Sequence, residues 1–224
     1  MLETVKFPNE NANRLENPNE KNLVWVLGLK RDMTSDALFF NSTYHQTADL
    51  PVTKRKILAV EQQIYHPLGM ICPFTLLPKL LLQECWKQKI AWDTELPEAL
   101  RKKFLSWQNQ ITHLKNIIIP RWMTKRTSPE KQCSLHVFAY ASKNAYAACI
   151  FIRIETEESV SGEFVKAKNT ITPLKTITVP RLELLTCLIA ARLAANVDLK
   201  RPDIETHYWT DSSNALSWIK RDEH

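Results

Sequence analysis

Two acidic residues in the second half of the chain stand where a strand pattern and a helix pattern meet. Glu183 lies near the start of an apolar helical stretch, in TVPRLELL at 178–185, and Asp211 lies in YWTDSS at 208–213. Phosphodiester hydrolysis by two metal ions requires carboxylates that converge on ions about 4 Å apart. We therefore interpret Glu183 and Asp211 as candidate catalytic residues and metal ligands.

Each of these residues also has a structural interpretation. Asp211 could cap the helix that follows it. Glu183 could form an ion pair with Arg181 or Arg192 on the surface. Neither carboxylate indicates a catalytic site by itself. Together they do, because they occur in the order along the chain that a fold bringing them to one point requires.

The patterns around them predict strands, a long helix, a strand and a short helix. The helix over 178–197 has Pro180 in its first turn, where a missing N–H costs nothing. Its expected buried side chains are Leu182, Leu185, Ile189 and Leu193. The predicted strands cover 135–140, 146–154, 162–168 and 205–210, and the short helix covers 211–219, with Ser212 or Ser213 as its cap.

This βββαβα order resembles the first part of ribonuclease H-like folds. In that topology a residue on the first strand, one on the first helix and one at the end of the fourth strand meet at one point. The segment FAYAS, 138–142, ends the first predicted strand, so it joins Glu183 and Asp211 in the candidate site.

The first half of the chain has a different pattern. Residues 1 to about 20 lack periodicity and are interpreted as a linker or disordered start. The apolar run 23–29 predicts one buried strand, with 37–40 as its hairpin partner across a turn at 31–36. Apolar periodicity predicts helices over 54–65, 74–91 and 97–114, with Trp86, Trp92 and Trp107 as packing residues.

A basic segment lies between the halves. Arg121, Lys125, Arg126 and Lys131 stand there against one acid, Glu130, and the chain carries a net charge of +6. Excess cations are compatible with a phosphate-backbone partner, because binding releases condensed counterions. We interpret these four residues as candidate nucleic-acid-binding residues; the alternative is a solvated linker.

Several classes of protein are excluded. The three glycines are too dispersed for a Walker or dinucleotide phosphate cradle, and the five cysteines include no CxxC pair for zinc. No apolar stretch has the roughly 18 residues needed to span a bilayer. The polar start has no signal-peptide pattern, so we expect an intracellular protein, cytoplasmic or nuclear, without a membrane partner.

Several motifs, in one order, resemble Pol proteins of BEL/Pao-type retrotransposons. The similarity covers roughly residues 23–220, and no single motif carries it alone. The motifs are VLGL at 26–29, TKRKIL at 53–58, YHPLGMICPF at 65–74, WKQKIAWDTELP at 86–97, IPRW at 119–122, AKNTITPLK at 167–175, TITVPRLELL at 176–185 and YWTDSSNALSWI at 208–219.

The resemblance implies an α/β fold, α+β overall, in which a helical reverse transcriptase thumb/connection precedes an incomplete ribonuclease H-like βββαβα domain. The implied domains are a linker over 1–20, a residual palm hairpin over 21–48, the thumb/connection over 50–120, a basic linker over 121–131, and a C-terminally truncated ribonuclease H-like domain over 132–224. The polymerase's YxDD-type motif would then lie before Met1.

The resemblance also implies a damaged metal site. The family pattern F-x-D-A-S places an aspartate ligand where this chain has Tyr140. A tyrosine phenol is uncharged near pH 7 and supplies no charge for Mg²⁺, the family's cofactor. A further acidic ligand would fall beyond His224, so we predict that Glu183 and Asp211 are insufficient and that Mg²⁺ is not bound productively.

The leading interpretation is a retrotransposon-derived Pol fragment that binds RNA–DNA hybrid or another nucleic acid weakly and no longer cleaves RNA. One alternative is an active, metal-dependent ribonuclease H that recruits Glu155 or Asp198 as a displaced ligand. Another is a domesticated protein-interaction module. The chain has no D-[ST]-G loop of an aspartic peptidase and no polymerase motif, and it indicates no particular protein partner.

Overall fold

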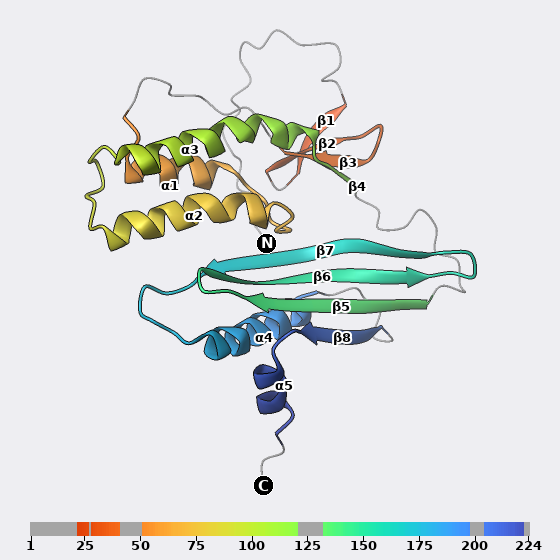
Figure 1. Ribbon diagram of the computed structural model, residues 1–224. Helices are drawn as coiled ribbons and strands as arrows, with labels where there is room; N and C mark the ends of the chain where they lie inside the picture. The colour runs from red at the N-terminus through yellow and green to blue at the C-terminus, as the bar shows by residue number, and fades with distance from the viewer. Residues whose placement is uncertain (1–21, 27, 41–50, 121–131, 198–203, 222–224) are drawn as a thin grey trace, which may run out of the picture.

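The computed structural model describes residues 22–26, 28–40, 51–120, 132–197 and 204–221, which form two lobes (Figure 1). The helical lobe contains β1 (Leu23–Val26), β2 (Leu29–Asp32), β3 (Ala37–Phe39), α1 (Lys54–Gln63), α2 (Cys72–Lys87), α3 (Glu98–Gln110), the 3₁₀ helix η1 (Ile111–Asn116) and β4 (Ile118–Pro120). The sheet lobe contains β5 (Gln132–Ala141), β6 (Ala145–Glu155), β7 (Val160–Ile171), α4 (Val179–Ala195), β8 (Glu205–Thr210) and α5 (Ser213–Ile219).

The prediction of one strand over 23–29 is wrong. Gly28 has a φ of +76°, a conformation that glycine adopts without strain, and Val26 pairs with Leu29 across the resulting two-residue turn. The apolar run is therefore a hairpin, β1–β2, and β3 pairs with β2. β4 returns from the far end of the helical region to complete this antiparallel sheet.

The three predicted helices of the first half are confirmed, and they enclose their own apolar core. Thr53 begins α1 by accepting a hydrogen bond from the Lys56 amide. Trp107 is buried in the core, as predicted. Trp86 and Trp92 instead lie near the surface, where their rings pack edge to face against each other.

The larger sheet has the order β7-β6-β5-β8. β5, β6 and β7 are antiparallel neighbours, and β8 returns parallel to β5 after the α4 crossover. Together with α5 this is the predicted βββαβα order, and the mixture of helices and strands confirms the predicted α/β class. β7 and β8 are the two edge strands.

α4 covers the aliphatic face of this sheet. Leu135, Val137 and Ile150 meet helix residues of the same core there. The buried positions of α4 are Leu182, Thr186, Ala190 and Leu193, so Leu185, 36% exposed, was wrongly placed in the core. Successive helix residues are about 100° apart, so a helix that turns Leu182, Thr186 and Ala190 toward the sheet holds Leu185 away from it.

All five cysteines are free thiols. Among the described residues, none of the helices has the length and apolar character required to cross a bilayer.

Candidate functional site

The parallel pairing of β5 with β8 brings two of the candidate positions to one end of the sheet. Ala139 pairs with Thr210 in the last register position of this ladder. Tyr140 and Asp211 are the next residues along their respective chains. The parallel direction of the two strands, set by the α4 crossover, therefore places FAYAS and YWTDSS side by side.

Glu183 joins this end of the sheet from the first turns of α4. Its carboxylate Oε2 accepts a hydrogen bond of 2.5 Å from the Ser212 hydroxyl. Ser212 follows Asp211 directly and is buried. The structure thus brings Glu183 into contact with the residue that follows Asp211.

Tyr140 lies at the same end but projects from the other face of the sheet. It alternates with buried Ala139 and Ala141, and Ala139 belongs to the core beneath α4. The Tyr140 side chain is 62% exposed and so faces solvent.

The donor set does not fit a two-metal site. Tyr140 offers an uncharged hydroxyl where the family pattern has an aspartate, which leaves Glu183 and Asp211 as the carboxylates of this candidate site. Within the described ranges, no group of three or more His, Cys, Asp and Glu side chains is arranged to hold a metal ion. Two carboxylates fall short of the ligand set that a pair of Mg²⁺ ions requires.

An active ribonuclease H would need Glu155 or Asp198 as a displaced metal ligand, and the structure describes Glu155. Glu155 pairs with Gln132 at the start of β5, whereas Tyr140 pairs with Ala147, so Glu155 lies at the opposite end of the sheet. Its carboxylate forms an ion pair with Arg153. Glu155 cannot replace the missing ligand, and Asp198 lies outside the described residues.

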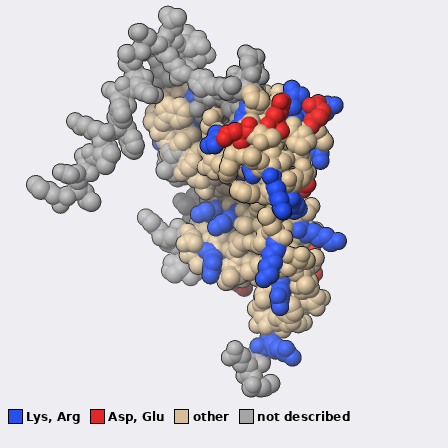
Figure 2. All heavy atoms as spheres, turned by 90° about the vertical axis from the view of Figure 1, so that its left-hand side faces the viewer, with Lys and Arg blue, Asp and Glu red and all other residues tan. Residues whose placement is uncertain are grey.

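Basic residues surround the site end of the sheet. Lys143 lies in the β5–β6 turn, Lys175 lies in the β7–α4 connection, and Arg181 lies in the first turn of α4; all three are exposed. Figure 2 views the molecule from this end and shows Lys and Arg atoms spread over the sheet lobe, with most acidic atoms gathered on the helical lobe. This end therefore attracts anions.

The predicted nucleic-acid-binding residues Arg121, Lys125, Arg126 and Lys131 lie outside the described residues. The three cations at the site end were not singled out from the sequence. They occur in separate segments with no local clustering, and only the strand and helix connections bring them to one place.

An aromatic face is a second feature that the sequence did not reveal. Rings from all four strands of the large sheet contact one another on the face opposite α4. In order across the sheet they are Phe164, Phe151, Phe138 and Trp209; His136 stacks on Trp209, and His207 stacks on His136. The Trp209 indole donates a hydrogen bond of 3.0 Å to Nδ1 of His136. The alternation of residues along a strand predicts which side chains share a face of the sheet. Which aromatic rings become neighbours depends on the register between the strands.

Solved structures include proteins with a similar fold. A foamy viral protease–reverse transcriptase dRH in complex with double-stranded DNA matches 88% of this chain at 14% identity with a TM-score of 0.50, a likeness that concerns the fold. A second foamy viral protease–reverse transcriptase structure with double-stranded DNA covers 91% of the chain at 14% identity with a TM-score of 0.48. The chain spans 32% and 40% of these two proteins.

No curated protein matches the chain. A family model described as the Pao retrotransposon-like RNaseH-like domain matches residues 53–212, which include α1 to α4, β8 and the Asp211 segment. The match spans both lobes and covers most of the chain. The chain therefore belongs to the family of Pao retrotransposon-like RNaseH-like domains.

Proposed function

We propose that this chain is a retrotransposon-derived Pol segment that binds nucleic acid, with RNA–DNA hybrid as the expected form, and that its ribonuclease H-type metal site is degenerate. The observation that carries the proposal is the position of Tyr140, beside Asp211 at the end of two parallel strands. The family pattern requires a carboxylate at that position.

Loss of hydrolysis follows from charge. Two Mg²⁺ ions bring four positive charges to the site, and carboxylates must offset them while phosphate enters. The uncharged phenol of Tyr140 contributes nothing to this balance, which leaves it to Glu183 and Asp211. We expect the remaining carboxylates to hold Mg²⁺ too weakly for catalysis.

Binding of nucleic acid is supported by charge and by position. The chain has a net charge of +6, and Lys143, Lys175 and Arg181 surround the end of the sheet where the degenerate site lies. Salt-dependent attraction to phosphates needs cations but no metal. The foamy viral structures, whose DNA is double-stranded, make a duplex the first ligand to test.

The test of hydrolysis is a cleavage assay on an RNA–DNA hybrid with Mg²⁺ or Mn²⁺. We expect no cleavage by the natural chain and none by Asp211→Asn. Metal-dependent cleavage by the natural chain that disappears in Asp211→Asn would overturn the proposal and establish the alternative of an active ribonuclease H.

The test of binding is a gel shift on the same hybrid over a series of salt concentrations. Replacing Lys143, Lys175 and Arg181 with Gln should weaken binding and reduce the salt slope, since each phosphate contact contributes about 0.9 to that slope. The matched control replaces three exposed lysines of the helical lobe, Lys102, Lys103 and Lys115, with Gln. Equal effects from the two sets would indicate unspecific charge attraction and contradict the assigned surface, and no shift at low salt would contradict binding itself.

A further inference from the structure

Two segments that lie apart from Tyr140, Glu183 and Asp211 meet between the lobes. One is the α1–α2 connection with the start of α2, which carries the motif at 65–74. The other is the end of β7, which carries the motif at 167–175. The Ala167 amide donates a hydrogen bond of 2.9 Å to the Leu68 carbonyl, and the Asn169 side chain donates one of 2.6 Å to the Cys72 carbonyl.

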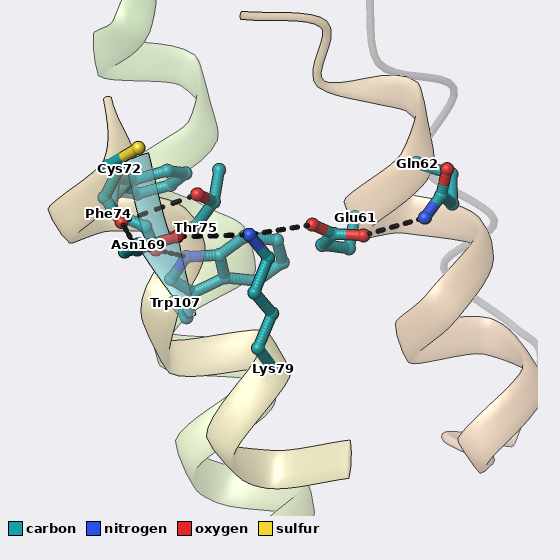
Figure 3. A network of polar contacts seen from close by, with 8 residues as sticks. All are labelled: Glu61, Gln62, Cys72, Phe74, Thr75, Lys79, Trp107 and Asn169. Carbon is teal, nitrogen blue, oxygen red and sulfur yellow. Dashed lines mark hydrogen bonds and ion pairs between the residues drawn. The ribbon is translucent and has the colours of Figure 1, made fainter. Parts of the chain in front are cut away.

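Side chains of α2 extend this junction along β7 (Figure 3). The Lys79 ammonium donates to the Asn169 side-chain oxygen at 3.2 Å and lies 3.9 Å from the Glu61 carboxylate of α1. One turn further along α2, the buried Gln83 side chain donates to the Thr172 carbonyl. Asn169 thus both donates to the helical lobe and accepts from it, which fixes the orientation of its amide.

Gly69 makes the close approach of the two lobes possible. It has a φ of +76°, and a Cβ atom at this position would lie 1.9 Å from the Ala167 carbonyl oxygen. That oxygen belongs to backbone, which cannot move aside as a flexible side chain would. A side chain at position 69 would therefore separate the connection from β7.

The junction also covers an edge of the large sheet. β7 is an edge strand, so its outward amides and carbonyls need partners or solvent. The Leu68 carbonyl satisfies the Ala167 amide in the way that a neighbouring strand would. These bonds fix the position of the helical lobe along β7. A shift along the strand would break both the bond from Ala167 to Leu68 and the bond from Asn169 to Cys72.

We infer that these contacts form an interlobe latch that makes the two lobes a single nucleic-acid-binding body. The latch consists of Leu68, Gly69, Cys72, Lys79 and Gln83 on the helical lobe and Ala167, Asn169 and Thr172 on the sheet. Figure 2 shows Lys and Arg atoms continuing from the helical lobe across this boundary onto the sheet lobe. One duplex can then contact both lobes in a fixed geometry; this part of the inference rests on the proposed function.

The latch itself is tested by hydrogen exchange of the full chain. The Ala167 amide should be protected in the natural chain, because its acceptor belongs to the other lobe. In Asn169→Leu, and separately in Gly69→Ala, that amide should exchange at least tenfold faster. The amides of Ala148 and Ile150, inside the sheet on β6, should keep their protection and so report that the fold is intact.

The matched control is Asn109→Leu, an equal substitution at an exposed position of α3 outside the latch. It should leave the Ala167 amide unchanged. An unprotected Ala167 amide in the natural chain would overturn the latch, and so would unchanged protection in both latch variants.

The coupling of the latch to binding is tested with the hybrid gel shift. Separate lobes bind with a lower effective concentration for the second contact, so both latch variants should bind the hybrid about tenfold more weakly than the natural chain and the control. Unchanged affinity in variants whose Ala167 amide has lost protection would overturn the coupling. If the natural chain does not bind at all, the proposed function fails while the exchange result still decides whether the latch exists.

Discussion

The Ser212 hydroxyl lies 2.5 Å from the Glu183 carboxylate, to which it donates, and 3.0 Å from the Ala215 amide, from which it accepts. One side chain therefore links the start of α4 to the start of α5. This contact gives Glu183 a structural role at the position where the family pattern expects a metal ligand. It explains how α5, a helix of seven residues, is held against the sheet lobe.

Ser212→Ala should destabilise the protein. It removes the N-cap of α5 and leaves the part-buried Glu183 carboxylate without its donor, so we expect the free energy of unfolding to fall by about 1–2 kcal/mol. Urea denaturation measures this change. Ser213→Ala, one residue later and exposed, is the control and should have a much smaller effect. Equal losses for the two variants would contradict the assigned contacts.

Trp86→Ala should destabilise the helical lobe through Lys54. The Lys54 side chain is only 2% exposed, and its ammonium lies 3.6 Å from the Trp86 ring centre and 5.0 Å from that of Trp92. Removing the nearer ring leaves a buried charge with a weaker partner, and we expect a loss of about 1–3 kcal/mol.

A double-mutant cycle separates this electrostatic effect from lost packing. In a Lys54→Met background the charge is absent, so Trp86→Ala should cost less than it does in the natural chain. Trp218→Ala, at another exposed tryptophan, should cost the same in both backgrounds. An additive cycle for Lys54 and Trp86 would rule out the cation–π contact as a source of stability.

Acid should destabilise the sheet lobe through His136. Burial lowers the pKa of His136, and the neighbouring charges of His207 and Arg153 lower it further. The unfolded chain then binds the proton more readily than the folded chain. The contribution of His136 to stability is therefore complete above the unfolded pKa of about 6.5 and is lost as the pH falls below it.

Urea denaturation above and below this range checks the sign. The fall in stability on acidification should be smaller in His136→Gln than in the natural chain. His113→Gln, at an exposed position of η1, should leave the fall unchanged. A stability that rises as the pH falls would contradict the direction of the His136 pKa shift.

Mg²⁺ should leave the melting temperature of the natural chain unchanged, because a ligand stabilises only the state that binds it. Tyr140→Asp places a carboxylate near Asp211, and Mg²⁺ should then raise the melting temperature by relieving the repulsion between them. Adding Asp211→Asn to that variant should remove the response. A Mg²⁺ response in the natural chain would indicate a functional metal site.

The order of strands and helices in the sheet lobe was predictable because local periodicity is strong there. Alternating apolar residues mark β5 and β6, and Pro180 marks the start of α4. The strand at 205–210 was predicted with the bounds that the structure gives. The same reasoning failed at 23–29, where a continuous apolar run hid the turn at Gly28. The residues on both sides of the turn are apolar, so composition does not mark where the first strand of the hairpin ends and the second begins.

The sequence by itself determined the family, because the family motifs depend on residue types in a fixed order, whereas the replacement of an aspartate at Tyr140 stays a prediction from the resemblance. It also predicted that Glu183 and Asp211 would approach each other, and the contact that the structure gives is between Glu183 and Ser212, the residue after Asp211. Only the tertiary structure decided that Ser212 donates a hydrogen bond to the Glu183 carboxylate, that Tyr140 faces away from α4, and that Gly69 and Asn169 join the lobes. These relationships depend on the register between strands and on contacts between residues about 30 to 100 positions apart, which no local pattern encodes.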